Sequence, residues 1–187
     1  LFALLTITLL TGALHEDGLA DTCDGLGGGI TRDHKLKIMR DSQIGSYGVM
    51  ALIFSFGLRW AAYSEIFELG YSFILATLIA TAAGSRSALP VIMYLIPFAR
   101  EDGLSFSAGK PSLDRAIIAL LIGICLLLFL LGFKISVVAL GASILIVGSF
   151  VYFIATRIGG QTGDVLGAAQ QLTEITILLA IIMVGIK

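Results

Sequence analysis

Apolar runs long enough for membrane helices alternate along this chain with short polar segments. A helix crosses a hydrocarbon core about 30 Å thick with ~20 apolar residues. On that criterion the sequence predicts spans at residues 47–62, 69–83, 116–132, 135–156 and 172–186. Residues 1–14 are apolar but short, and because the first residue is Leu we expect them to be the end of a span that begins upstream. The predicted fold is all-α, a polytopic helical membrane protein in a single domain over residues 1–187, with about five complete transmembrane helices plus a truncated N-terminal one.

Three features refine this pattern. Residues 89–98 are apolar but short and are bounded by Pro90 and Pro97, which favours a re-entrant or surface-lying piece over a span. Residues 30–46 mix charged and apolar positions, as a short interfacial helix does. Only two residues separate the predicted spans 116–132 and 135–156, so we expect a tight antiparallel hairpin there.

Composition narrows the class further. The chain is 57% hydrophobic and only 13% charged, with a net charge of -1 and a mean hydropathy of +0.99. These values exclude a disordered chain and argue against a water-soluble fold. No alternating ten-residue strand pattern is present, so helices rather than a barrel are expected to cross the membrane. Cys23 and Cys125 share no CxxC spacing, and neither a disulfide nor a zinc site is predicted.

Basic residues are distributed unevenly between the two ends of the predicted spans. Nine fall in loops on one side: Arg32, Lys35, Lys37, Arg40, Arg86, Arg100, Lys110, Arg115 and Arg157. Three lie toward the other side: Arg59, Lys134 and Lys187. The positive-inside rule makes the basic side cytoplasmic. The polar segments at residues 15–25, 86–115 and 157–171 then share that face and can form one site.

The segment at residues 15–25 concentrates carboxylates directly after an apolar run. If it is helical, Asp17, Asp21 and Asp24 stand at i, i+4 and i+7 and point the same way, within an arc of roughly 60°. Carboxylates this close repel one another unless a cation lies among them, and hard oxygen ligands favour Mg²⁺, Ca²⁺ or Mn²⁺. We interpret the segment as a divalent-metal site at the mouth of the protein. The alternative is a solvated juxtamembrane loop.

A second polar cluster lies near the C-terminal end, at residues 159–164. Asp164, Gln171 and Glu174 fall near one helical stripe that enters the last span. The glycines of this segment, Gly163 among them, let backbone N–H groups approach an anion or let helices come close. The glycine pattern alone also fits a flexible turn, and the carboxylate that enters the span favours the functional interpretation.

Basic residues beside these clusters suit phosphate oxygens, because Arg forks make bidentate contacts. Arg40 and Asp41 adjoin the glycine turn at Gly45, and Arg86 directly follows a predicted span. Each of these basic residues can instead be a topological anchor. Carboxylates, basic residues and a membrane interface together indicate phosphoryl or nucleotidyl transfer assisted by metal ions.

Three segments carry a resemblance to a known family: residues 15–25 (HEDGLADTCDG), 38–48 (IMRDSQIGSYG) and 160–168 (GQTGDVLGA). The chain resembles cobalamin synthase, the adenosylcobinamide-GDP ribazoletransferase family, over essentially its whole length. Family members carry further N-terminal membrane segments, so the resemblance implies an N-terminally truncated chain. It also implies a Mg²⁺-dependent transferase that joins α-ribazole or its 5′-phosphate to adenosylcobinamide-GDP and releases GMP, the last assembly step of vitamin B12.

From the motifs and the resemblance we assign expected roles. The metal ligands are Asp17, Asp21, Asp24 and Asp164, and the residues for cofactor or phosphate binding are Arg40, Arg86 and Gly163. The catalytic residues are Asp24, Asp41 and Glu174, and which of these is the general base stays open. We expect a bacterial or archaeal inner membrane, contact with membrane lipid, an active site on the cytoplasmic face, a possible homo-oligomer and no nucleic-acid partner.

Two other classes of protein compete with this interpretation. Residues 21–25 are also similar to part of the CDP-alcohol phosphotransferase motif, but that motif's following Ala-Arg and complete second aspartate pair are missing. An ion-coupled transporter is a third hypothesis, since intramembrane carboxylates bind coupling ions. It predicts two related halves and acids near the midplane, whereas the acids here stand at the ends of spans.

Overall fold

The computed structural model describes residues 1–185, and the regular elements of this part of the chain are all helices, without a β-sheet. The predicted all-α class is therefore confirmed. The helices, in chain order, are α1 (Phe2–Leu10), α2 (Leu14–Gly28), α3 (Arg32–Ile38), α4 (Ser46–Phe67), α5 (Tyr71–Ser87), α6 (Leu89–Leu95), α7 (Gly103–Ala108), α8 (Leu113–Ile158) and α9 (Gly163–Gly185).

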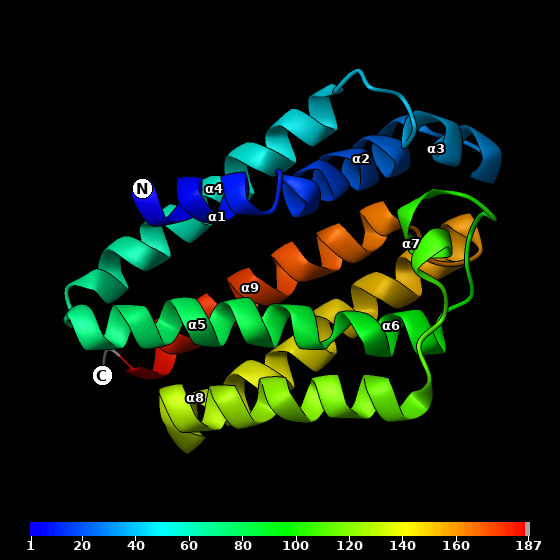
Figure 1. The fold of residues 1–187 in the computed structure, drawn as a ribbon. Coiled ribbons are helices and arrows are strands. Elements are labelled where there is room, and N and C mark those ends of the chain that lie inside the picture. Colours follow the sequence, from blue (N-terminus) through cyan, green and yellow to red (C-terminus); the bar gives the residue numbers. More distant parts are fainter. Residues whose placement is uncertain (186–187) are drawn as a thin grey trace.

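Helix α9 is the centre of the bundle and packs against α2, α4, α5 and α8 (Figure 1). Most of its apolar side chains are buried, with Ile177 and Leu178 each 1% exposed and Ile181 not exposed. By contrast, α4 and α8 carry many exposed large apolar side chains on their outer faces. An apolar outer surface around a buried central helix is what a lipid environment requires.

Three helical runs are long and apolar enough to cross a membrane: Tyr71–Leu95, Leu113–Ile158 and Gly163–Gly185. These runs confirm a helical membrane protein. They overlap four of the five predicted spans, the one predicted at residues 69–83 beginning at Tyr71 in the structure. Ile186, the predicted end of the last span, lies outside the described residues. The remaining one, residues 47–62, lies in α4, which is long enough but is not among the three apolar runs. The number of spans therefore stays a prediction.

Helix α8 contains the predicted hairpin. Gly132 has a φ of 77° and breaks the helical geometry in the middle of the element. Figure 1 shows the chain reversing direction at this point, so that the two halves of α8 run back along each other. A positive φ is accessible to glycine at little steric cost, which is why the turn needs so few residues. The antiparallel pair expected at residues 116–132 and 135–156 is thus confirmed.

Residues 89–98 were predicted to form a re-entrant or surface-lying piece, and the structure differs: they contain helix α6, which packs in the bundle. A single residue separates it from the end of α5, and it continues in nearly the same direction as α5 (Figure 1). Pro90 stands in its first turn, where proline removes no helical hydrogen bond. Ile92 is buried against Val147 and Val151 of α8. Helix α6 is therefore part of the bundle wall.

The polar segments meet at one end of the bundle. Figure 1 shows α3, α7, the end of α8 and the beginning of α9 grouped there. The break between α1 and α2, where Gly12 and Ala13 both have positive φ, separates the apolar first helix from the acidic second helix. The structure therefore brings the polar segments at residues 15–25, 86–115 and 157–171 toward the same end of the bundle, as expected. The cytoplasmic location of that end stays a prediction.

Candidate functional site

A close crossing of α2 and α9 builds the site. A Cβ added to Gly18 would lie 2.8 Å from the backbone oxygen of Asp164 and 3.2 Å from the Cα of Gly167. A Cβ on Gly167 would likewise lie 3.2 Å from the backbone of His15. The two helix backbones therefore touch, as small residues allow in membrane bundles. This contact brings the carboxylates on either side of Gly18 next to the first turn of α9.

Three carboxylates near this crossing influence one another electrostatically: Asp17 and Asp21 from α2 and Asp164 from α9, which we call the acidic cluster. Partial burial, followed by the charges of Asp17, Asp164 and Asp24, raises the pKa of Asp21 to about 7. Burial is the larger cause of this shift, and the repulsion between the carboxylates adds to it. The structure thus brings together the first and second polar clusters of the sequence, as predicted.

Asp164 is held in place by its neighbours. Its Oδ2 accepts hydrogen bonds from Thr162 Oγ1 at 3.1 Å and from an Arg100 guanidinium nitrogen at 3.3 Å. Thr162 also accepts from the backbone N–H of Val165 and so caps the beginning of α9. Arg100 reaches the site because the backbone of residues 97–99 pairs with Gln161, with N···O distances of 2.9 and 2.8 Å. The sequence indicated only that Arg100 is a basic loop residue, and no motif identified it as part of the site.

Asp24 is engaged in a different contact from the other aspartates. It is 7% exposed, and its two carboxylate oxygens accept hydrogen bonds from the backbone N–H groups of Gly45 and Gly48, at 2.7 and 2.9 Å. A carboxylate at the beginning of a helix satisfies orphan donors and complements the helix dipole. Asp24 therefore fastens α2 to the beginning of α4, and its predicted role as metal ligand or base stays a prediction.

The other predicted site residues lie at the same end of the bundle in separate places. Asp41 is exposed in the loop before α4, and its Oδ1 accepts from the N–H of Gln43 at 3.0 Å. Arg40 is exposed and paired with Asp102. Gly163 opens α9 beside Asp164. Arg86 donates to the carbonyl of Ala82 within α5, on the side of α2 that carries His15.

Lys35, expected from the sequence as one of the basic loop residues, has a structural partner. It is 6% exposed, and its Nζ donates to the backbone carbonyls of Gly29 and Ile30. These carbonyls follow the C-terminus of α2, where a cation is favourable. Lys35 is therefore a structural residue that closes the end of α2.

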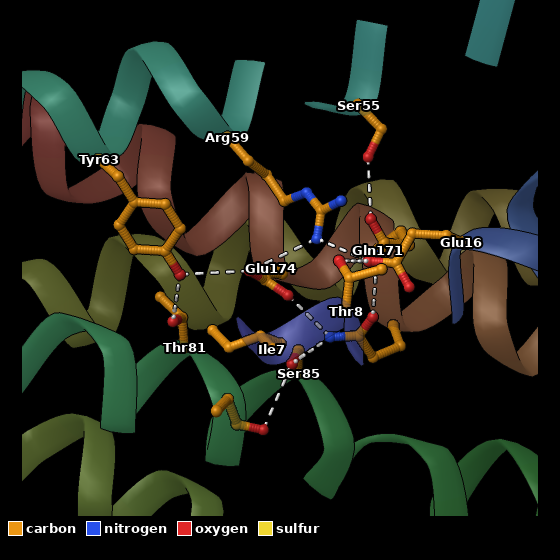
Figure 2. A network of polar contacts seen from close by, with 12 residues as sticks. Ile7, Thr8, Glu16, Ser55, Arg59, Tyr63, Thr81, Ser85, Gln171 and Glu174 are labelled. Atoms are coloured by element: carbon orange, nitrogen blue, oxygen red, sulfur yellow. Dashed lines mark hydrogen bonds and ion pairs between the residues drawn. The ribbon is translucent and has the colours of Figure 1, made fainter. Parts of the chain in front are cut away.

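Glu174 belongs to a second, deeper set of polar contacts (Figure 2). It is 2% exposed, accepts from Tyr63 at 3.2 Å and from Gln170 at 2.9 Å, and lies 4.0 Å from Arg59. Arg59 in turn donates to Glu16 at 3.1 Å. We call the group of residues joined in this way the buried polar network; its members are Thr8, Glu16, Ser55, Arg59, Tyr63, Thr81, Ser85, Gln170, Gln171 and Glu174.

This network separates Glu174 from the acidic cluster. Glu174 follows Asp164 by ten positions along α9, which corresponds to ~15 Å along the helix axis at 1.5 Å per residue. The structure also corrects the placement of Arg59, which is not at the far side of the membrane but 2% exposed inside the bundle. The only signal in the sequence was a basic residue within an apolar run, and such residues pair inside membrane proteins.

The acidic cluster fits a magnesium ion held jointly with a substrate. Within residues 1–185, no three His, Cys, Asp or Glu side chains are gathered closely enough to hold a metal ion by themselves. Mg²⁺ in phosphoryl-transfer sites is commonly bound by one or two carboxylates, several waters and the phosphates of the substrate. Asp17, Asp21 and Asp164 supply the hard oxygen donors that this mode of binding needs, and their mutual repulsion favours a cation.

The fold and the site define a helical membrane protein with carboxylates and arginines gathered at one end of its bundle. Residues 1–182 match the family described as cobalamin-5-phosphate synthase. The chain belongs to that family, and the resemblance found in the sequence is confirmed.

Curated relatives agree with this assignment, and three of them are named adenosylcobinamide-GDP ribazoletransferase. The protein from Bradyrhizobium diazoefficiens is 51% identical, over 96% of this chain and 68% of the relative. Those from Azorhizobium caulinodans and Mesorhizobium japonicum are 46% and 47% identical, over 98% and 95% of this chain and 71% and 67% of the relatives. No solved structure matches the chain.

Proposed function

We propose that this protein is the transferase that joins α-ribazole, or its 5′-phosphate, to adenosylcobinamide-GDP in the last assembly step of cobalamin. A ribose hydroxyl oxygen that is free in both α-ribazole and its 5′-phosphate, and so is not the 5′-oxygen, forms a bond to the cobinamide-linked phosphorus. The bond between that phosphorus and the bridging oxygen of the pyrophosphate breaks, and GMP leaves with the bridging oxygen. The family match over residues 1–182 and the names of the relatives support this reaction.

The observation that carries the proposal is the crossing of α2 and α9, which places the acidic cluster and Arg100 at one end of the bundle. A pyrophosphate bears several negative charges, so it needs cationic partners for both its ground state and its leaving group. Arg100 is such a partner, and it is held beside Asp164 at 3.3 Å. The carboxylates alone would repel the substrate, which supports a cation between the two.

We assign that cation as Mg²⁺, with Asp17, Asp21 and Asp164 as the residues that would hold it. When bound, it would neutralise the pyrophosphate and stabilise the charge on the departing phosphate. Asp17, Asp21 and Asp164 would fix the position of the cation, and Arg100 and Arg40 bind phosphate oxygens.

For the general base we propose Asp41. Of the three candidates, Glu174 is sealed in the buried polar network and both oxygens of Asp24 accept backbone hydrogen bonds. Asp41 keeps an exposed carboxylate beside Arg40, and only one of its oxygens accepts from Gln43. A carboxylate in this position takes the proton of the attacking hydroxyl and releases it to solvent.

The test is turnover by the purified protein in detergent or nanodiscs. Adenosylcobinamide-GDP, α-ribazole and Mg²⁺ are supplied, and GMP and cobalamin are measured by chromatography. A CDP-alcohol with a lipid acceptor serves as the control substrate pair. Formation of GMP and cobalamin in equal amounts supports the proposal. Turnover of the CDP-alcohol instead would assign the lipid reaction, and no product from either pair would remove the proposed activity.

We further propose a bacterial inner membrane with the site on the cytoplasmic face. The excess of basic residues at the end of the bundle that carries the acidic cluster supports this orientation. Single cysteines introduced at Arg157 and Glu68, in a variant with Cys23 and Cys125 replaced, mark the two ends of the bundle. A membrane-impermeant reagent applied to intact cells should label the cysteine at position 68 and not the one at 157, and the reverse pattern would overturn the orientation.

A further inference from the structure

A cavity of about 570 Å³ lies beside the acidic cluster, between α3 and the segment that leads into α7. Its volume is within the range of roughly 300–1,000 Å³ that is typical of small-molecule sites. We call it the basic cavity, because four of the residues that line it are basic; the charged and aromatic lining residues are Arg32, Asp33, Lys37, Arg40, Phe98, Arg100 and Glu101.

The walls of the basic cavity are held rigidly. Helix α3 packs Leu36 and Met39 against the end of α8 and the beginning of α9. Arg32 ties the same helix to the opposite wall, since its guanidinium donates to the carbonyls of Ile158 at 2.8 Å and Ala99 at 2.5 Å. A positively charged site whose backbone walls are fixed in advance binds an anion at a lower ordering cost.

Arg100 belongs to both the basic cavity and the acidic cluster. It lines the cavity and pairs with Asp164, and its side chain is 14% exposed. Its Nη1 is buried without a hydrogen-bond partner among the described residues. A buried guanidinium nitrogen without an acceptor is costly, and a phosphate oxygen is a suitable acceptor. One anion can therefore contact Arg100 from the cavity while its other end reaches the acidic cluster.

We propose that the basic cavity binds the nucleotide half of the pyrophosphate substrate, so that the phosphate of the departing GMP lies against Lys37, Arg40 and Arg100. This inference rests on the proposed function for the identity of the substrate. The carboxylates of Asp33 and Glu101, which line the same cavity, accept hydrogen bonds from N1–H and N2–H of guanine. Adenine lacks this pair of donors, so the cavity discriminates between the two bases.

Binding of GMP tests the site apart from the reaction. GMP affinity is measured by titration calorimetry on the purified protein in EDTA, which removes any contribution from a metal ion. Lys37→Gln is the informative variant, because Lys37 is exposed on α3 and its loss leaves the helix contacts intact. The matched control is Lys110→Gln, another exposed lysine, which lies over the ring of Tyr94 and does not line the cavity.

We expect Lys37→Gln to weaken GMP binding about tenfold, the usual effect of losing one charge-assisted phosphate contact. Lys110→Gln should bind GMP like the wild type. The wild type should bind GMP more tightly than AMP, and the double variant Asp33→Asn, Glu101→Gln should bring the two affinities together. Unchanged GMP affinity in Lys37→Gln would overturn the phosphate assignment, and a GMP preference that survives the double variant would overturn the base assignment.

Turnover separates this inference from the proposed function. If the wild type converts adenosylcobinamide-GDP while Lys37→Gln has an unchanged KM, the reaction stands and the cavity assignment fails. If GMP binding depends on Lys37 but no cobalamin forms, the cavity is a guanine-nucleotide site and the proposed reaction fails. A raised KM in Lys37→Gln with intact turnover in Lys110→Gln supports both.

Discussion

Gly18 of α2 and Gly167 of α9 meet backbone to backbone, since a Cβ on Gly18 would lie 3.2 Å from the Cα of Gly167 and 2.8 Å from the carbonyl oxygen of Asp164. The atoms that a Cβ on Gly18 would meet belong to the backbone, so no flexible side chain can move aside to make room for it. We therefore expect Gly18→Ala to separate the two helices, to lower the thermal midpoint in detergent and to abolish GMP release.

The matched control for this substitution is Gly57→Ala in α4. A Cβ at Gly57 would meet no atom within 4 Å, and alanine is a better helix former than glycine by up to about 1 kcal/mol. This variant should be as stable as the wild type or slightly more stable, with normal turnover. A Gly18→Ala protein that behaves like Gly57→Ala would contradict the close crossing.

Arg59 compensates two carboxylates inside the bundle. Its guanidinium lies 3.1 Å from Glu16 and 4.0 Å from Glu174, and its side chain is 3% exposed. Removing one partner of a buried ion pair leaves charge uncompensated and costs about 3–5 kcal/mol. Arg59→Met should therefore unfold at markedly lower temperature or denaturant concentration. The control Arg157→Met, which removes an exposed arginine over Phe153, should change stability by less than about 0.5 kcal/mol.

A second substitution tests the balance of charge in the same network. Glu174→Gln in the Arg59→Met background removes one of the two uncompensated carboxylates. We expect it to restore part of the lost stability, measured by the same unfolding assay. If the double variant is as unstable as the sum of the two single variants, Arg59 and Glu174 are not coupled in the way their contact indicates.

Asp24 has a structural contact that the spacing of the aspartates does not reveal. Its carboxylate accepts from the N–H groups of Gly45 and Gly48 at the beginning of α4. Loss of a capping carboxylate typically costs about 0.5–2 kcal/mol. Asp24→Ala should therefore lower the free energy of unfolding even in EDTA, where no metal role can contribute. A loss of stability confined to Mg²⁺-containing buffer would favour the metal-ligand role instead.

The sequence predicted the helical class, the hairpin around Gly132 and the meeting of residues 15–25 with the beginning of α9. These follow from apolar run lengths, from the short loop and from the parity of membrane crossings. The partner of Asp24, the placement of Arg59 and the role of Arg100 were not predictable, because each depends on contacts between helices far apart in the sequence. Periodicity places a side chain on a face of its helix but does not identify the atoms opposite.

Asp21 makes metal-free stability depend on pH. Its pKa is raised from 3.8 to about 7, first by burial and then by the charges of Asp17, Asp164 and Asp24. A pKa raised in the folded state contributes stability that is present below the unfolded pKa and is lost as pH rises toward the folded one. In EDTA, the wild type should therefore lose stability between about pH 4 and pH 7.

Asp21→Asn removes this titration and should be the more stable protein above pH 7 in EDTA, and we expect it to release no GMP. The difference in thermal midpoint between the two proteins should grow as pH rises from about 4 to about 7 and then level off. Adding Mg²⁺ should raise the midpoint of the wild type and not that of Asp21→Asn, because a bound cation offsets the repulsion that the Asn variant lacks. Parallel stability profiles of the two proteins over this range would show that Asp21 is not in a repulsive acidic cluster.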